Sequence, residues 1–315
     1  MDTHLTTSPE EAATFVRRGQ LAAFPTETVY GLGADAFQPT AVEAIFEAKG
    51  RPADNPLIVH LAARAQLRQV VAAVPAVAET LLDRFAPGPL TLILPKAEGL
   101  PGVVTAGLDT VGVRFPGHEG ARAFLRACDT PVAAPSANRS GRPSPTHWTA
   151  VQEDLGGRIA CILKGGRTDA GVESTVLDCT SEPPTVLRPG AISVEELRAA
   201  IGTVDVADAS ETDTTRSPGT KHRHYAPAAQ VRLVRTPAAA DPGPTAAYIG
   251  LEAPARPEAF GQCRVLEDVE AYARELFHFF RACDRAGCTV IYAQVVTAEG
   301  LGRALNDRLE RAAAR

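Results

Sequence analysis

Short apolar segments alternate with longer amphipathic ones through the first two hundred residues, and this alternation limits the possible folds more than any other feature. Seven apolar segments have the length and composition of buried strands: residues 21–24, 57–61, 90–94, 111–115, 131–134, 159–163 and 174–179. Strands that alternate with helices are typical of a sheet that is covered by helices. The pattern therefore predicts an α/β domain.

Two capping boxes mark the starts of helices in this region. Ser8, Pro9 and Glu11 occupy the N-cap, first and third helical positions of one box, and Ser193 begins a second. Gly202 then stands where a helix ends in a C-terminal cap. We therefore predict that the first domain covers residues 1–202.

Residues 203–228 lose all periodicity and are rich in Thr, Asp and Ser, which predicts a linker. Its second half, SPGTKHRHYAP, gathers charged, histidine and tyrosine side chains between prolines, and an inert linker has little use for them. A second, smaller α/β pattern covers residues 229–315, with strands at 230–234, 245–250 and 289–293 and helices near 267–286 and 300–313. The length of 315 residues suits two such domains.

Composition narrows the class of protein. The net charge of −5 argues against a generally basic nucleic-acid binder, although a local basic groove remains compatible with it. The N-terminus does not resemble a signal peptide and the apolar runs are too short to span a bilayer, so we expect a cytoplasmic protein without a membrane contact. The six cysteines show no metal-finger spacing, which favours scattered core thiols in a reducing compartment.

The stretch FPTETVYGLG, residues 24–33, places hydrogen-bonding side chains directly before Gly31 and Gly33. The following GLGADA fits the dinucleotide fingerprint, and Asp54 lies at about the right spacing for a ribose contact, so a nicotinamide dehydrogenase is one alternative. In that fold the glycines follow the strand at once, whereas here the six residues PTETVY intervene. We therefore favour a structural glycine turn beside ligand-binding side chains.

Several other polar stretches border the predicted strands. Lys49, Arg51 and Asn55 precede the strand at 57–61 and suit phosphate or carboxylate oxygens, although a solvated turn is an equal alternative. His60 lies within that strand, where a core histidine is the simpler interpretation. Arg114 lies within an apolar strand, so it needs either an anionic ligand or an intraprotein salt bridge.

The loop APSANRSGRPSPTH, residues 134–147, is the densest polar segment. Ser136, Asn138 and Ser144 offer hydroxyl and amide groups on a backbone stiffened by prolines, which suits a phosphate cradle. A Ser/Pro linker is the alternative, but it does not explain the apolar strands on both sides. Ser174 and Arg188 add a hydroxyl and a cation further along the chain.

The chain shows no G-x-S-x-G elbow, H-E-x-x-H motif or Walker loop, and no cysteine in an electropositive setting. Its candidate site supplies cations and neutral donors without an evident nucleophile. Such a set suits two anionic substrates that react with each other, where alignment alone can contribute on the order of 7–11 kcal/mol.

In this order, the stretches resemble the YrdC-like domain of the threonylcarbamoyl-AMP synthases, in the longer form that carries a small Sua-type domain. The matching motifs are PTETVYGLG, KGRPADNPLIVH, PGPLTLIL, TAGLDTVGVRFPGH, APSANRSGRPSPT, GVESTV, VLRPG and SPGTKHRHYAP. The resemblance implies a YrdC-like open twisted sheet with a large concave cleft and a small C-terminal Rossmann-like α/β domain. It also implies that L-threonine, bicarbonate and ATP give L-threonylcarbamoyladenylate and pyrophosphate, for the t6A modification next to the tRNA anticodon.

The resemblance assigns roles by position. L-threonine would be bound by Thr28, His60, Arg114, Ala134 and Ser174, with Arg114 on its carboxylate. ATP would be bound by Lys49, Arg51, Asn55, Thr110, Ser136, Asn138, Ser144, Arg188 and Tyr225, and Lys49 and Arg51 would also offset charge during catalysis. Residues 203–228 would form an active-site lid as well as a linker, although Thr220 and His222 depart from the apolar or aromatic residues expected there.

The resemblance further implies Mg²⁺ that enters with ATP, no organic cofactor and no metal held by the protein itself. It implies a hand-over to the tRNA threonylcarbamoyl-transfer machinery and leaves open a weak tRNA contact. Two alternatives stay open: a carbamoyl-transfer enzyme of the hydrogenase-maturation kind, which normally carries zinc-finger cysteines, and an RNA-binding module, which the acidic net charge disfavours.

Overall fold

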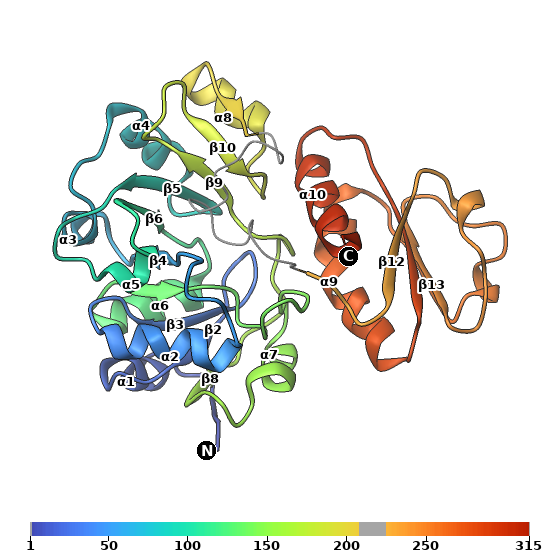
Figure 1. Ribbon diagram of the computed structural model, residues 1–315, viewed down its shortest axis with the longest axis horizontal. Coiled ribbons are helices and arrows are strands. Elements are labelled where there is room, and N and C mark those ends of the chain that lie inside the picture. The colour runs from blue at the N-terminus through green and yellow to red at the C-terminus, as the bar shows by residue number, and fades with distance from the viewer. Residues whose placement is uncertain (1, 208–224, 315) are drawn as a thin grey trace.

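Two β-sheets organise residues 2–207 and 225–314, the part of the chain that the computed structural model describes (Figure 1). The larger sheet has eleven strands in the order β1-β8-β2-β3-β7-β4-β6-β5-β9-β10-β11. These strands are β1 (His4–Thr6), β2 (Ala22–Phe24), β3 (Gly31–Asp35), β4 (Ile58–His60), β5 (Leu90–Pro95), β6 (Thr110–Arg114), β7 (Val132–Ala134), β8 (Cys161–Leu163), β9 (Thr175–Asp178), β10 (Thr185–Arg188) and β11 (Asp205–Val206). The smaller sheet has four parallel strands, in the order β12-β15-β13-β14: β12 (Gln230–Val234), β13 (Ala246–Gly250), β14 (Gln262–Val265) and β15 (Val290–Gln294). The predicted fold class is confirmed.

All seven strands predicted for the first two hundred residues are present, each within two residues of its expected ends. The pattern missed β1, β10, β11 and β14, which are short and partly exposed and therefore lack a long apolar signal. The boundaries at residues 202 and 229 stay a prediction. Most of the expected lid, residues 208–224, lies outside the described residues.

The glycine segment is a strand rather than the turn that we expected. Gly31–Asp35 forms β3, which pairs antiparallel with β2 and β7. A Cβ on Gly33 would lie 2.8 Å from Val132 Cγ1 and 3.1 Å from the ring of Phe24. These glycines therefore allow close packing of side chains over the sheet. The dehydrogenase alternative is wrong, because its glycines must lie in a strand-to-helix turn.

Helices cover the two faces of the large sheet unequally. One face carries α2 (Pro39–Lys49), α3 (Leu67–Val70), α4 (Ala76–Phe85), α5 (Gly102–Thr105), α7 (Trp148–Leu155) and α8 (Val194–Ile201). On the other face, α1 (Pro9–Arg17) and α6 (Glu119–Cys128) pack over β2, β7 and β8. Because side chains alternate along a strand, Val59 and Val113 join the core under the first set of helices, and His60 and Arg114 lie on the face of α1 and α6. This second face positions the candidate site.

The predicted helix caps are largely confirmed. The Ser8 Oγ accepts a hydrogen bond from the Glu11 N–H at 3.1 Å, but the Glu11 carboxylate binds His4 and Thr6 instead of returning to the cap. The first capping box is therefore only half formed. At α8 both halves are present, and Gly202 ends the helix with a φ of 82°.

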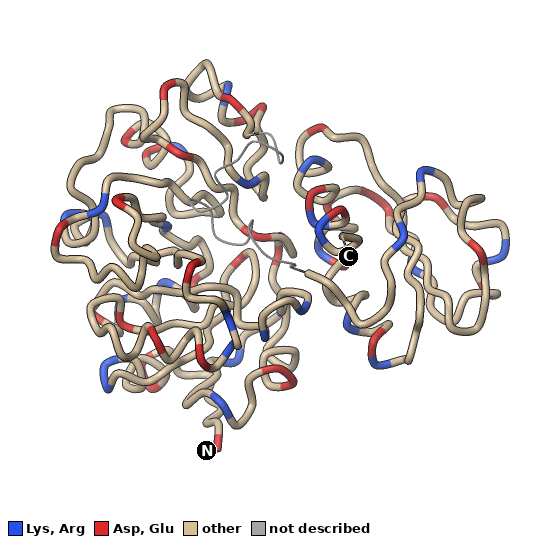
Figure 2. The backbone as a smooth tube through the Cα atoms, in the orientation of Figure 1, with Lys and Arg blue, Asp and Glu red and all other residues tan. Residues whose placement is uncertain are grey.

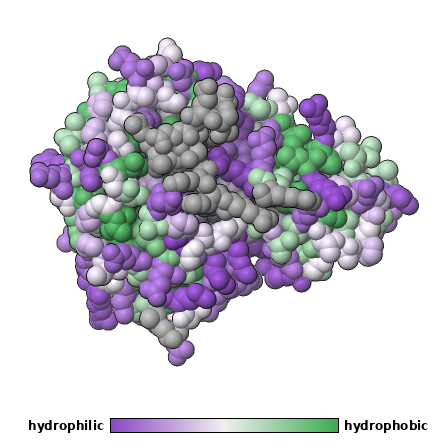
Figure 3. Space-filling view, viewed as in Figure 1, coloured by the Kyte–Doolittle hydropathy of each residue, from purple (hydrophilic) through white to green (hydrophobic). Residues whose placement is uncertain are grey.

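In the smaller domain, α9 (Val269–Arg285) and α10 (Leu301–Ala313) pack on the side of the sheet that faces the large domain (Figure 1). The helix predicted near 267–286 is α9, and its residues Ala273, Leu276, Phe280 and Cys283 are fully buried. Short 3₁₀ turns at Arg64–Gln66, Pro237–Ala239 and Pro257–Ala259 complete the elements. Acidic and basic positions are interspersed along both domains (Figure 2), as are hydrophilic and apolar residues on the visible face (Figure 3).

Candidate active site

A cavity of about 60 Å³ lies on the face of the large sheet that carries α1 and α6. All five residues predicted for L-threonine line it: Thr28, His60, Arg114, Ala134 and Ser174. Four residues predicted for ATP line it as well: Arg51, Ser136, Arg188 and Tyr225. Nine predicted residues that are spread over about two hundred positions of the sequence therefore line the same cavity.

Arg114 is a buried cation in the lining of the cavity. It is 4% exposed, and its guanidinium donates to the Thr28 Oγ1 at 2.9 Å and lies 2.7 Å from the Glu27 carboxylate. Burial alone would raise the pKa of Glu27, but the charge of Arg114 outweighs it and lowers that pKa. The salt bridge that the sequence left open is therefore present, and it leaves Arg114 on the cavity wall.

His60 is the register partner of Arg114 on the neighbouring strand. Its Nδ1 lies 3.2 Å from the Ile58 carbonyl oxygen, which can only accept, so Nδ1 carries the hydrogen and Nε2 is an acceptor. Burial, and then the charge of Arg114, lowers the pKa of His60 to about 3. His60 is therefore a neutral acceptor in the cavity wall at physiological pH.

Ser174 lies between two strands and is fixed from both sides. Its Oγ is 2.8 Å from the Thr91 hydroxyl on β5, and its carbonyl accepts from Arg188 at 2.8 Å. Arg188, at the end of β10, is 4% exposed and also reaches the Ser174 hydroxyl at 3.2 Å. Burial lowers the pKa of Arg188. One hydroxyl and one cation are thus held together at the cavity.

Arg51 provides a second buried cation. One of its terminal nitrogens donates to the Pro56 carbonyl at 3.2 Å, and its Nε has no hydrogen-bond partner among the described residues. Burial lowers its pKa to about 10. A buried guanidinium with an unsatisfied N–H is costly without a ligand, so Arg51 is a candidate for binding an anion.

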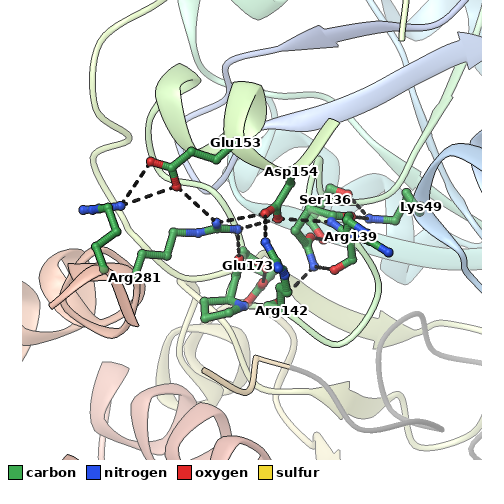
Figure 4. Close-up of polar contacts among 12 residues, drawn as sticks. Lys49, Ser136, Arg139, Arg142, Glu153, Asp154, Glu173 and Arg281 are labelled. Carbon is green, nitrogen blue, oxygen red and sulfur yellow. Dashed lines mark hydrogen bonds and ion pairs between the residues drawn. The ribbon is translucent and has the colours of Figure 1, made fainter. Parts of the chain in front are cut away.

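Lys49 lies behind the cavity wall instead of on it. Its ammonium donates to the backbone carbonyls of Ser136 and Asn138, and the Asn138 amide donates to two further carbonyls of the same loop at 2.9 Å. Burial, followed by the charge of Arg51, lowers the pKa of Lys49 well below its usual range. Lys49 and Asn138 therefore hold the shape of the 136–142 loop. Figure 4 shows Lys49 beside Ser136.

Two other residues predicted for ATP, Thr110 and Asn55, also lie outside the cavity lining. Thr110 begins β6 and pairs with Pro95, and the Asn55 carbonyl accepts from Arg51 at 3.4 Å. Ser144 does not line the cavity itself, but it contacts a residue that does. Its hydroxyl donates to the carboxylate of Glu173, a lining residue, at 2.6 Å.

Sequence reasoning missed two sets of charged residues that support this site. Glu173 stood in a quoted motif but had no role, and it pairs with Arg308 of α10 at 2.7 Å. Asp154 on α7 anchors the 136–142 loop: it accepts from Arg142 at 2.8 Å and from Arg281 of α9 at 2.7 Å (Figure 4). The pairs Glu173–Arg308 and Asp154–Arg281 each join segments more than a hundred residues apart, for which a single sequence carries no local signal.

Neither a membrane span nor a metal cluster is found in the ranges 2–207 and 225–314. No helix there is both long and apolar enough to cross a bilayer. No three His, Cys, Asp or Glu side chains there are grouped as metal ligands. The histidines at 222 and 224 lie outside the described residues.

Comparison with known proteins identifies the family of this chain. A family model described as "Telomere recombination" matches residues 14–190, and one described as "Threonylcarbamoyl-AMP synthase, C-terminal domain" matches residues 192–314. The threonylcarbamoyl-AMP synthase of Pyrococcus abyssi is 48% identical over 96% of this chain and 92% of its own length. That of Bacillus subtilis is 52% identical over 71% of this chain and 65% of its own length.

A solved structure extends the match to three dimensions. The crystal structure of P. abyssi Sua5 complexed with L-threonine superposes with a TM-score of 0.89 at 44% identity, covering 99% of this chain and 97% of the other. Both sheets, and the cavity on the larger one, lie within the superposed region. The chain therefore belongs to the threonylcarbamoyl-AMP synthase family.

Proposed function

We propose that this chain is an L-threonylcarbamoyladenylate synthase, a nucleotidyltransferase that converts L-threonine, bicarbonate and ATP into threonylcarbamoyl-AMP and pyrophosphate. The observation that carries the proposal is the presence of three buried cations, Arg51, Arg114 and Arg188, in the lining of one cavity. The family supports it, since a relative of 44% identity has been solved with L-threonine.

Arg114 is suited to the threonine carboxylate. A guanidinium has five N–H donors. In Arg114 the Nε donates to the Gly88 carbonyl and one terminal nitrogen donates to Thr28, whereas the other terminal nitrogen lies 2.7 Å from Glu27 without a hydrogen bond to it. Among the described residues this leaves at least one donor on each terminal nitrogen, which is the arrangement that binds a carboxylate through both oxygens. We assign the neighbouring His60 Nε2 to accept a hydrogen bond from the substrate, with Thr28, Ser174 and the Ala134 backbone completing the pocket.

Arg51 and Arg188 are assigned to the phosphates of ATP, with Ser136 and Tyr225 beside them. The unpartnered Nε of Arg51 supports this assignment, because an anion would satisfy it. Asn55, Thr110, Asn138 and Ser144 stay in the proposed nucleotide site as residues that border or shape it. Lys49 is proposed to act through the loop that carries Ser136, which its ammonium fixes at two carbonyls.

The residues fit Mg²⁺ that arrives with the triphosphate better than a metal caged by protein. Mg²⁺ prefers phosphate oxygens and water, and it typically takes only one or two protein carboxylates. Glu173, a carboxylate on the cavity wall, is already held by Ser144 and Arg308. When bound, the ion would neutralise charge on the phosphates.

The chemistry needs no side-chain nucleophile. The threonine amine and bicarbonate give a carbamate and water, and a carbamate oxygen then forms a bond to the α-phosphorus as the bond to pyrophosphate breaks. Arg51 and Arg188 would stabilise charge as it grows on the leaving pyrophosphate. Arg114 would hold the amino acid so that its carbamate faces the nucleotide.

We propose the domain division 1–202, 203–228 and 229–315, with Tyr225 closing the nucleotide end. Tyr225 is buried, lines the cavity and stacks on Phe277 of α9 at 5.3 Å between ring centres. We further propose that the product passes to tRNA threonylcarbamoyl-transfer machinery for t6A formation. A cytoplasmic location is proposed because all six cysteines are free thiols.

The test is pyrophosphate release from ATP and Mg²⁺, with and without bicarbonate, compared for L-threonine, L-serine and no amino acid. Release that requires both bicarbonate and L-threonine is the expected result. Release that is indifferent to the amino acid would overturn the proposal and favour a carbamoyl-transfer or RNA-binding role.

A further inference from the structure

Arg308 is the largest fully buried side chain among the described residues, and it belongs to the small domain. It projects from α10, the last helix, and pairs there with the neighbouring Asp307, yet its other polar contacts lie at the cavity. A buried guanidinium is tolerated only where charges and hydrogen bonds compensate it. The partners of Arg308 therefore reveal what this side chain does.

The guanidinium of Arg308 contacts three segments at the cavity, close to the residues that we assign to the nucleotide. Its Nε donates to the Glu173 carboxylate at 2.7 Å, and a terminal nitrogen donates to the Pro189 carbonyl at 3.0 Å. Its Cζ lies 5.2 Å from the centre of the Tyr225 ring, which is within the range of a cation–π contact. Glu173 and Tyr225 line the cavity, and Pro189 directly follows Arg188, which does so too.

Glu173 connects Arg308 to other residues of the site. Its second oxygen accepts from the Ser144 hydroxyl at 2.6 Å, and the next residue along the chain is Ser174. The same segment touches the small domain again at Gly171, where a Cβ would lie 2.3 Å from the Arg274 Cα of α9. The short segment from Gly171 to Ser174 is thus held at both ends by helices of the small domain.

The charge on Glu173 depends on Arg308. Complete burial would raise the pKa of this carboxyl, but the charge of Arg308, and then that of Arg188, outweighs burial and lowers the pKa. Without Arg308, Glu173 would keep Arg188 as its cation, so its negative charge would be less compensated beside the place assigned to the phosphates of ATP. Repulsion between the two anions would then weaken nucleotide binding.

We propose that Arg308 is a positioning residue for the nucleotide end of the active site. From the small domain, it fixes Glu173, through Glu173 the Ser144 hydroxyl, and independently the ring of Tyr225. The inference rests on the proposed function for the identity of the nucleotide. It gives the small domain a definite task, because the nucleotide site is complete only when α10 is docked on the large domain.

The experiment compares Arg308→Met with Arg303→Met in the full-length protein. Arg303 lies on the same helix and approaches Glu195 of the large domain at 3.8 Å, but it contacts no cavity residue that the structure describes. Arg308→Met should raise the KM for ATP by about tenfold or more and change the KM for L-threonine by less than about threefold. Arg303→Met should change neither. A fall in Tm for Arg308→Met with both KM values unchanged would overturn the proposal, since it would indicate a purely structural role.

Glu173→Gln supplies the second measurement. In the Arg308→Met background it removes a carboxylate that has lost its main counter-charge, so the double variant should have a lower KM for ATP than Arg308→Met alone. An additive loss in the double variant would contradict the proposed coupling. If Arg308→Met does not fold, Glu173→Gln alone should still raise the KM for ATP, and an unchanged value would overturn the proposal.

The shift in Tm that ATP alone produces in the wild type and in the variants tests the role of Arg308 separately from the proposed synthase reaction. It reports nucleotide positioning even if the wild type releases pyrophosphate without needing L-threonine. Loss of this ATP shift in Arg308→Met, together with its retention in Arg303→Met, would support the role of Arg308 independently of the reaction. An equal ATP shift in both would overturn it.

Discussion

Glu27 and Arg114, a residue of the cavity lining, form an ion pair of 2.7 Å, with the Arg114 side chain 5% exposed and the Glu27 side chain 15% exposed. Arg114 therefore has a counter-charge before any substrate arrives. The pair resolves a choice that the sequence left open, since an arginine within an apolar strand needs a salt bridge or an anionic ligand. Here the salt bridge is present and the guanidinium still lines the cavity.

Glu27→Gln should lower the free energy of unfolding by roughly 2–3 kcal/mol, because Arg114 stays buried without its counter-charge. It should also increase the rise in Tm that L-threonine produces, because the substrate carboxylate would then supply the missing charge. Differential scanning fluorimetry with and without L-threonine measures both effects. Asp83→Asn is the control, since it breaks the exposed pair with Arg64 at 2.6 Å and should cost less than about 1 kcal/mol. A smaller response to L-threonine in Glu27→Gln would contradict the assignment of Arg114 to the carboxylate.

His60 should make the stability of the protein fall in acid. Its pKa is about 3 in the folded state against an ordinary value of 6.5, so between these values the unfolded chain binds the additional proton. The contribution to stability is complete above pH 6.5 and is lost at about 1.4 kcal/mol per pH unit as the pH falls toward 3. The His60→Gln variant cannot lose stability in this way. The difference between its free energy of unfolding and that of the wild type should therefore become smaller as the pH falls from 7 to 4.5. Denaturant unfolding at the two pH values tests this, and a constant difference would show that His60 titrates normally.

Gly33→Ala should destabilise the large domain by about 1–3 kcal/mol, because a new Cβ would clash with Val132 Cγ1 at 2.8 Å. The same side chain would meet the ring of Phe24, which packs against His60, so activity should fall along with stability. Gly102→Ala is the matched control, since a Cβ there meets nothing within 4 Å and the residue lies in a helix. Equal Tm values for the two variants would refute the packing role of Gly33.

The strand pattern and the polar residues that interrupt it were readable from the sequence. His60 and Arg114 stand within apolar strands, so their side chains had to face either a ligand or a partner, and they line the cavity. The turn assigned to Gly31 and Gly33 was wrong for a physical reason. Glycine serves a turn and a tightly packed strand equally well, and only the neighbours across the sheet distinguish the two.

The support of the site from the small domain was not predictable in the same way. Arg308 lies among Leu305, Leu309 and Ala312 on the buried face of α10, where the helical period leads one to expect only apolar side chains. Its partner Glu173 is 135 residues away in the chain. Such a pair is specified by how the two domains dock, and one sequence contains no local record of that docking.

The last prediction concerns Lys49. It distinguishes whether this residue binds the phosphates of ATP directly or holds the loop that carries Ser136. Its side chain is enclosed, and its ammonium donates to the carbonyls of Ser136 and Asn138. Lys49→Met leaves both carbonyls without this donor, at about 1–3 kcal/mol each, so the loop should shift and pyrophosphate release should fall by about a hundredfold. Lys49→Arg keeps the charge, but its planar fork does not fit the enclosed space, so this variant should be impaired almost as strongly. Lys96→Met, at a partly exposed position, should retain wild-type activity. If Lys49→Arg kept the wild-type KM for ATP, Lys49 would act as a simple positive charge toward the phosphates, and its assignment to the loop would be wrong.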